Sequence, residues 1–228
     1  MVIYTQNTSI NLHSMVKLTE DFIMYEYRTD ILAKIQERLI HMIQHHSKVL
    51  VVRFDVRFPE NAPLPQRNDA ISALMKHLKD WFSLNSIEAH YLWVREQNLS
   101  ETPHYHVAFL INGNRCQTGT GLLQSASQAW SVILNYPWPQ GLVHYCDLDG
   151  GRAWIMLCRP SAQSKGAEQA AFGFQVQAVF ERLAYLAKTY SKDLAPYRVR
   201  DFGTSLLRVE TPVPMVIPTL YPGAQTAV

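Results

Sequence analysis

The sequence predicts an α+β protein with a five-stranded, mainly antiparallel sheet flanked by helices. Two patterns lead to this fold class. Amphipathic stretches with a helical period alternate with short runs of β-forming residues, and two pairs of those runs have the connections of β-hairpins. Hairpins place antiparallel strands side by side, and the helices between them must cover a face of the sheet.

Length and composition describe an ordinary globular chain. It has 228 residues, of which 47% are hydrophobic and 18% charged, so it can bury a core and is neither disordered nor fibrous in composition. No apolar stretch reaches the roughly 18 residues of a membrane helix, and the N-terminus lacks the pattern of a signal peptide. We therefore expect a cytoplasmic protein without a membrane partner.

The charge balance and the cysteines exclude several classes of protein. With 21 Lys and Arg against 19 Asp and Glu, the formal net charge is +2. Proteins that coat duplex DNA are far more basic, so any contact with nucleic acid is expected to be local. Cys116, Cys146 and Cys158 show no C-x-x-C spacing and are expected to be reduced, mostly buried thiols rather than disulfides or zinc ligands.

Three regions divide the chain. Residues 1–30 are predicted to form an N-terminal arm, since most of this segment is polar and aperiodic. Residues 31–208 contain the periodic segments and are predicted to form the folded domain. Residues 209–228 hold four prolines and almost no charge, which is typical of an extended tail.

The domain begins with a helix, a strand and a second helix. Apolar residues recur at helical spacing over residues 31–43. Residues 48–58 alternate strictly, which predicts a central strand with one apolar face. The polar face of this strand carries Arg53, Asp55 and Arg57. A proline-rich loop then leads to an amphipathic helix over residues 71–81.

Two hairpins with a helix between them follow. Residues 89–96 and 104–111 are rich in aromatic and aliphatic β-formers and are separated by a seven-residue loop. The helical pattern of residues 122–135 is stopped by two prolines. A second hairpin is predicted from residues 142–147 and 153–158, because the Asp-Gly-Gly sequence between them favours a tight turn.

The first hairpin carries a candidate metal site. If Glu96 lies opposite His104, alternation puts Glu96, His104 and His106 on one face of the sheet. Two imidazoles and a carboxylate can hold a divalent cation, Mg²⁺ or Mn²⁺, and leave positions open for phosphate oxygens. The alternate residues of the second arm are apolar, so the core is expected on the other side and the histidine face in contact with solvent.

Histidine spacing alone is weak evidence for this site. With nine histidines in the chain, a His-x-His triplet arises by chance with a frequency of about 0.4. His45 and His46 are adjacent, point to different faces and are interpreted as helix-terminal residues rather than ligands. His90 shares the face of Glu96 but lies about 20 Å along the strand at ~3.3 Å per residue, so it is interpreted as structural.

A long helix is predicted over residues 166–192, with a tyrosine on its charged face. Tyr185 and Lys188 are three residues apart and therefore neighbours on that face. At 100° per residue Tyr190 falls on the apolar side, which favours Tyr185 as a nucleophile. The alternative is an incidental tyrosine on a solvated face. The buried stripe is expected to comprise Phe172, Val176, Val179, Leu183, Leu186 and Tyr190.

The order of these features resembles the HUH endonucleases. In that superfamily a strand motif precedes a His-hydrophobic-His strand, and a later helix carries Tyr-x-x-Lys; the similar segments here are VLVVRFDVRFP, HYHVAFL and YLAK. More narrowly, RFD, LWVRE and the late YLAK helix resemble the gene-two-like replication initiation proteins of filamentous phages (inoviruses), including the YagK/YfjJ type of bacterial prophages. The similarity spans residues 31–200.

This resemblance implies a replication-initiator-like fold and an HUH-like nuclease domain over residues 31–208. The implied site comprises His104, His106 and Glu96 as metal ligands, Tyr185 as the nucleophile and Lys188 as the residue that assists it. Tyr190 and Lys192 overlap the motif and leave a second assignment open.

The implied function is that of a rolling-circle DNA replication initiator in the cytoplasm of a bacterial host. Tyr185 would nick single-stranded or origin DNA and form a 5′-phosphotyrosine and a free 3′-OH, which later reseals the strand. Host replication proteins are further implied partners. Arg53 and Arg57 are candidates for DNA phosphates, whereas Tyr91 and Trp93 are interpreted as core aromatics rather than base-stacking residues.

Other functions stay open at this point. A plasmid relaxase or a single-strand transposase would use the same residues on different DNA. A prophage DNA-binding regulator would retain the fold without catalysis. A phosphoesterase would hydrolyse its substrate with a metal-bound water and form no covalent intermediate.

Overall fold

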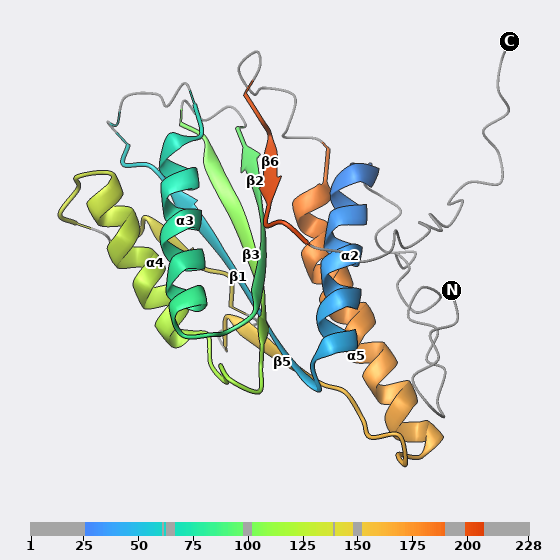
Figure 1. The fold of residues 1–228 in the computed structure, drawn as a ribbon. Helices are drawn as coiled ribbons and strands as arrows, with labels where there is room; N and C mark the ends of the chain where they lie inside the picture. The colour runs from blue at the N-terminus through green and yellow to red at the C-terminus, as the bar shows by residue number, and fades with distance from the viewer. Residues whose placement is uncertain are drawn as a thin grey trace, which may run out of the picture.

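A central antiparallel sheet lies between two pairs of helices in the computed structural model (Figure 1). The described residues are 26–60, 62, 67–97, 102–138, 140–147, 152–189 and 199–207. The α+β class is thereby confirmed. The predicted arm (1–30) and tail (209–228) fall almost wholly outside the described residues, as do Tyr190 and Lys192.

The core of the sheet is formed by three long strands, β1 (Lys48–Arg57), β3 (His104–Asn112) and β2 (Ala89–Glu96). The strand order is β4-β1-β3-β2-β6, and β5 also pairs with β1. The first predicted hairpin is confirmed, and its register sets Glu96 opposite His104. The edge strand β6 (Phe202–Thr204) was not predicted, since three residues are too short for a periodicity.

The second predicted hairpin is wrong. The strands β4 (Val143–Tyr145) and β5 (Trp154–Cys158) do not pair with each other; both pair antiparallel with β1, at residues 54–56 and 48–52. Both therefore run in the same direction, end to end along one edge of β1. The ten residues of β1 give hydrogen-bonding partners to both short strands, and this long-range pairing prevails over the local turn preference between them.

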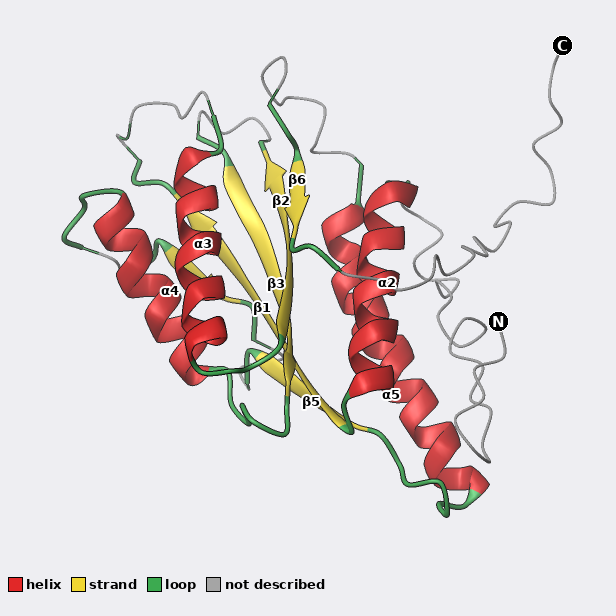
Figure 2. Ribbon diagram, viewed as in Figure 1, coloured by secondary structure: helices red, strands yellow, loops and turns green. Residues whose placement is uncertain are grey.

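The two helix pairs cover the two faces of the sheet (Figure 2). Helices α3 (Asp69–Leu84) and α4 (Thr120–Ile133) pack on the face predicted to be apolar, and α2 (Thr29–His45) and α5 (Gly166–Ala184) pack on the histidine face. The buried residues of β1 and β3 on the first face are Leu50, Val52, Phe54, Val56, Tyr105, Val107, Phe109 and Ile111.

The histidine face is not solvated along its length, contrary to the expectation from the sequence. Ala108 and Leu110 follow His106 on that face and are buried in a second core beneath α2 and α5. Apolar residues occupy this face of β1 and β2 as well, at Val51 and Leu92. The predicted ligand residues therefore lie at one end of this face, next to the part that the helices cover.

The last predicted helix is shorter than expected. Helix α5 ends at Ala184 and continues as one turn of 3₁₀ helix, η2 (Tyr185–Ala187). Lys188 then forms an antiparallel bridge with Tyr27, and the Arg28 N–H donates to the Ala187 carbonyl at 2.8 Å. This pairing draws the backbone out of the helix. The predicted buried stripe is confirmed for Phe172, Val176, Val179, Leu183 and Leu186.

The cysteines are more exposed than expected. Cys116 and Cys146 lie half-buried in loops, and Cys158 is exposed at the end of the edge strand β5; all three are free thiols. Within the described residues, no helix is long and apolar enough to cross a membrane.

Gly203 is predicted to be intolerant of a side chain. A Cβ atom at Gly203 would lie 2.6 Å from atoms of the Trp93 ring, which is 6% exposed and cannot move aside freely. We expect Gly203→Ala to lower the free energy of unfolding by about 1–3 kcal/mol in urea denaturation. Gly121→Ala is the control, because no atom lies within 4 Å of a Cβ there. Equal losses in both variants would contradict the packing of β6 on β2.

Candidate functional site

Glu96, His104 and His106 meet at the loop end of the β2–β3 hairpin. One nitrogen or oxygen atom of each lies within 4.8 Å of the others. The Nε2 atoms of both histidines approach the same carboxylate oxygen, Glu96 Oε2, at 3.2 Å for His104 and in a shorter contact for His106. The alternation of side chains thus brings the three predicted ligands together.

A fourth residue, Asp55, joins this group from β1. It lies opposite His106 in the β1–β3 register, and its Oδ1 is 2.7 Å from His106 Nδ1. A carboxylate on Nδ1 fixes the orientation of the ring and leaves Nε2 directed at Glu96. The sequence placed Asp55 on the polar face of its strand but did not assign it to the site.

The four side chains form a strongly coupled electrostatic group. Asp55, Glu96 and His106 are each at most 6% exposed. Burial disfavours a charge on His106, but hydrogen bonds to Asp55 and Glu96 outweigh it and raise the pKa of the imidazole. Burial likewise disfavours a charge on Asp55, and the hydrogen bond to His106 outweighs it and lowers the pKa of the carboxyl.

This donor set fits a divalent cation. Two carboxylates converge on one imidazole, and a second imidazole faces the same oxygen. The raised pKa of His106 favours a proton on the imidazole that offsets the excess negative charge, and a cation bound by Glu96, His104 and His106 would take over that role. Asp55 would then act as the outer partner that orients His106.

Tyr185 approaches this group from the end of α5. Its half-buried ring lies edge-on to the His106 ring, with 5.7 Å between centroids and 90° between planes. Two cations lie against the same ring: the Arg53 guanidinium carbon is 4.4 Å and Lys188 Nζ is 4.5 Å from its centroid. The structure therefore brings the predicted tyrosine, lysine and histidines together.

The surroundings of Tyr185 come from three separate elements. Arg53 projects from β1 and donates from Nη1 to the Arg182 carbonyl of α5 at 3.5 Å. Lys188 is held next to η2 by the bridge with Tyr27. Burial and the neighbouring Arg53 lower the pKa of Lys188.

A comparison with protein families identifies the chain. The family model described as the YagK/YfjJ C-terminal domain matches residues 5–205, which include every residue of the site. The chain belongs to the YagK/YfjJ C-terminal domain family. This confirms the YagK/YfjJ part of the resemblance drawn from the sequence. No curated protein and no solved structure matches the chain.

The two predicted DNA-binding arginines lie in different surroundings in this YagK/YfjJ domain. Arg53 contacts the Tyr185 ring, whereas Arg57 is exposed opposite His104 in the β1–β3 register. Arg57 and His104 both line a groove of about 1040 Å³ between the end of β1, the approach to β3 and the end of α4. Arg57 is thus separate from Tyr185 but adjacent to His104.

The other aromatic residues and the histidine that the sequence analysis set aside on β2 lie away from this group. Trp93 is buried against Tyr105, and Tyr91 packs against Phe109, so both belong to the core, as interpreted from the sequence. His90 is likewise apart from Glu96. It contacts Glu88, as does His46 at the end of α2, a contact that the sequence did not indicate.

Asp55→Asn is predicted to weaken divalent-metal binding. Loss of the carboxylate removes the orienting partner of His106, so we expect the affinity for Mn²⁺ in calorimetric titration to fall about 10–100-fold. The pKa of His106, followed by NMR of the imidazole, should fall as well. Asp80→Asn on the exposed side of α3 is the control. Unchanged Mn²⁺ affinity in Asp55→Asn would contradict the role of Asp55 as the residue that orients His106.

The raised pKa of His106 also predicts a pH-dependent stability of the metal-free protein. Folded His106 holds its proton more tightly than the unfolded chain, whose histidines titrate near ~6.5. The protonated imidazole therefore contributes fully to the free energy of unfolding below the unfolded-state pKa. This contribution is lost as the pH rises through the higher pKa of His106 in the folded protein. In urea denaturation with a chelator, wild-type stability should decline across this range more steeply than that of Asp55→Asn. If the free energy of unfolding falls equally with pH in both proteins, the proposed interaction between His106 and Asp55 is contradicted.

Proposed function

We propose that this protein nicks and rejoins single-stranded DNA through Tyr185, as a rolling-circle replication initiator. One observation carries this proposal: a tyrosine flanked by two cations lies against a histidine of a two-histidine, one-glutamate ligand set. Such a set beside a nucleophile suits phosphoryl transfer, in which positioning and charge stabilisation supply most of the catalysis.

Glu96, His104 and His106 would hold the divalent cation, Mg²⁺ or Mn²⁺. When bound, this cation supplies polarisation of the scissile phosphate and neutralises charge on its oxygens. The protein's own contribution is to keep the ligands in place: Asp55 orients His106, and the cross-strand register holds Glu96 beside His104.

Arg53 and Lys188 would activate Tyr185. A phenol has a pKa near ~10 and is a weak nucleophile at neutral pH until its anion is stabilised. Two positive charges at 4.4 and 4.5 Å from the ring favour the phenolate over the phenol. The lowered pKa of Lys188 increases the share of neutral amine, which can accept the phenolic proton and then carries the second of these positive charges.

The chemical step exchanges one phosphodiester for another. The Tyr185 oxygen attacks phosphorus, the bond from phosphorus to the 3′ oxygen breaks, and the proton lost by the phenol ends on that 3′ oxygen. The products are a 5′-phosphotyrosine and a free 3′-OH. Attack by a 3′-OH on the phosphotyrosine reverses the step, so the strand is rejoined without ATP.

The groove beside His104 offers a path for the DNA strand. Arg57 lies on its wall and can neutralise a backbone phosphate. Tyr136, 36% exposed on the same groove, presents an aromatic surface on which a base can stack. Since His104 lines the groove as well, a strand held there passes the ligand set.

The proposal predicts a covalent adduct that depends on Tyr185. Labelled single-stranded oligonucleotides from the replication origin of the element that encodes the protein are incubated with it and Mn²⁺, and adducts are resolved by denaturing electrophoresis. Wild-type protein should form the adduct, and Tyr185→Phe should form none. Tyr91→Phe, in the opposite core, is the control and should retain it.

Three outcomes would contradict the proposal. Adduct loss in Tyr190→Phe with retention in Tyr185→Phe would transfer the nucleophile to Tyr190. Cleavage that survives Tyr185→Phe without any adduct would indicate a phosphoesterase. Binding of the oligonucleotide without cleavage or adduct would indicate a DNA-binding regulator.

A further inference from the structure

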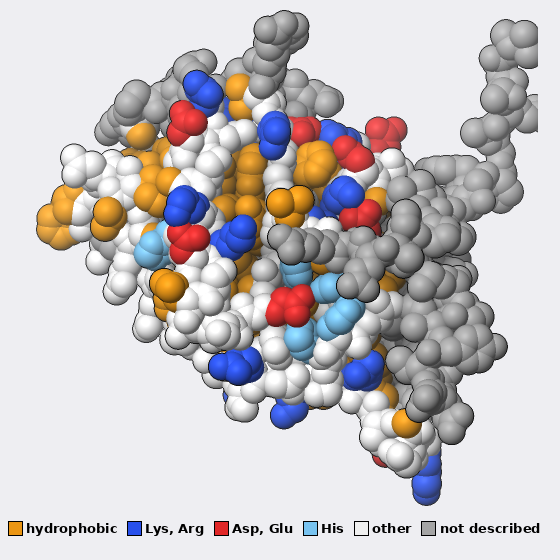
Figure 3. All heavy atoms as spheres, viewed as in Figure 1, with side chains coloured by type: hydrophobic (Ala, Val, Ile, Leu, Met, Phe, Trp, Pro, Cys, Tyr) orange, Lys and Arg blue, Asp and Glu red, His pale blue; other side chains and the backbone are white. Residues whose placement is uncertain are grey.

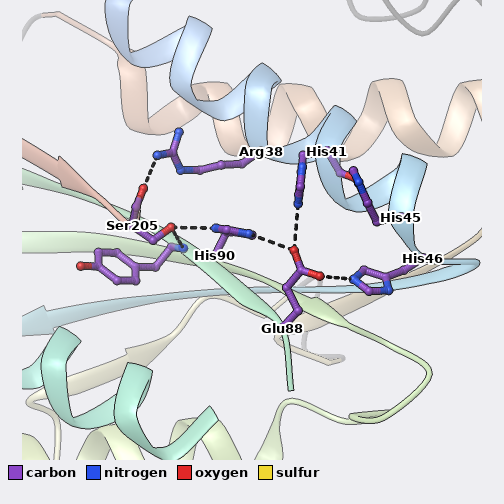
Figure 4. A network of polar contacts seen from close by, with 8 residues as sticks. Arg38, His41, His45, His46, Glu88, His90 and Ser205 are labelled. Atoms are coloured by element: carbon purple, nitrogen blue, oxygen red, sulfur yellow. Dashed lines mark hydrogen bonds and ion pairs between the residues drawn. The ribbon is translucent and has the colours of Figure 1, made fainter. Parts of the chain in front are cut away.

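A second group of histidines surrounds a single carboxylate at the opposite end of β2 (Figure 4). Glu88 Oε1 is 2.8 Å from His41 Nε2 and 3.2 Å from His90 Nε2, and Glu88 Oε2 is 2.8 Å from His46 Nε2. His41 lies in the last turns of α2 and His46 directly follows that helix, whereas Glu88 directly precedes β2 and His90 lies at its start. The cluster therefore joins a helix to a strand.

This cluster is separate from the Glu96 site. Glu88 and Glu96 lie eight residues apart on the same face of one extended segment, which places them roughly 26 Å from each other at ~3.3 Å per residue. Leu92 and Val94 are buried in the core between them. One ion cannot serve both sites.

We propose that Glu88, His41 and His90 bind a transition-metal ion of the Zn²⁺ class, with His46 holding the second carboxylate oxygen. The ligand atoms of the three residues lie within 4.8 Å of one another, so one ion can contact all of them. Imidazole nitrogens with one carboxylate form a donor set that Zn²⁺ and its neighbours in the first transition row bind well.

The protonation states suit a metal ligand set. Burial opposes the charged form of Glu88, but hydrogen bonds from His41, His46 and His90 outweigh it and lower its pKa to about 2. Burial of His90, with His41 and Arg38 nearby, lowers the pKa of that imidazole. These shifts favour the ionised carboxylate and the uncharged imidazole, the forms in which both residues bind metals.

An outer partner fixes the ring of His90. Its Nδ1 lies 3.1 Å from the hydroxyl of Ser205, which also accepts a hydrogen bond from the Tyr91 N–H at 3.1 Å. Arg38, 2% exposed, donates to the Ser205 carbonyl and holds this segment against α2. Metal-bound histidines in proteins have such a partner on the second nitrogen, because it sets the tautomer and the ring orientation.

The cluster is accessible from solvent. The side chains of His41, His46 and His90 are 17, 13 and 11% exposed, and that of Glu88 is 38% exposed. Figure 3 shows histidine side chains gathered around acidic atoms on the surface of this face. An ion can thus enter without unfolding, and once bound it would clamp the end of α2 to β2.

Zinc titration of the full-length protein tests the proposal. Zn²⁺ affinity and stoichiometry are measured by competition with a chromophoric chelator, and Co²⁺ spectra report the ligand field. We expect Glu88→Gln and His41→Ala each to weaken binding of one equivalent by at least about tenfold. His77→Ala, an exposed histidine on α3, is the control and should bind as the wild type does.

A variant that lacks the Glu96 site distinguishes Zn²⁺ binding at this cluster from binding at that site. A Glu96→Gln/His104→Ala variant should still bind one Zn²⁺ and still gain thermal stability from it, whether or not the protein nicks DNA. Unchanged Zn²⁺ affinity in both Glu88→Gln and His41→Ala would overturn the proposal, as would loss of all binding in the Glu96→Gln/His104→Ala variant. If Glu88→Gln does not fold, the Zn²⁺ affinity of His41→Ala alone tests the proposal.

Discussion

A buried imidazole held between two carboxylates is the interaction on which the candidate site depends. Asp55 on β1, His106 on β3 and Glu96 on β2 form one hydrogen-bonded row across the three central strands. Burying such groups costs free energy, which the mutual contacts only partly offset, so a row of this kind is more typical of a functional site than of a stabilising device.

The fold explains why this row lies where Tyr185 can reach it. The second core beneath α2 and α5 covers most of the histidine face and ends at His106. Helix α5 runs along that core, and the 3₁₀ turn η2 that follows it sets Tyr185 against the imidazole. The bridge between Tyr27 and Lys188 then stops the helix and keeps Lys188 beside the tyrosine ring.

Sequence patterns predicted the contacts that form between residues close together in the chain. Glu96 and His104 share one hairpin, so alternation and the simplest hairpin register were sufficient to place them together. Asp55 was missed as a site residue because its partner lies on a strand 51 residues away, and strand order does not follow from periodicity. Glu88 was missed for a similar reason, since its histidines meet only when α2 packs beside β2.

The two errors in the predicted elements have the same origin. Between β4 and β5 a local turn preference was overruled by pairing with β1. The helical pattern after Ala184 was overruled by pairing with the segment before α2. In both places long-range hydrogen bonding decided the backbone, and a single sequence gives no direct information on such partners.

Anomalous diffraction from crystals of the protein grown with Mn²⁺ would test the central claim most directly. The account predicts an anomalous peak in contact with Glu96, His104 and His106, with the Tyr185 hydroxyl turned toward the same ion. A structure with no peak among these three residues at saturating Mn²⁺, or with Tyr185 packed away from His106, would contradict it.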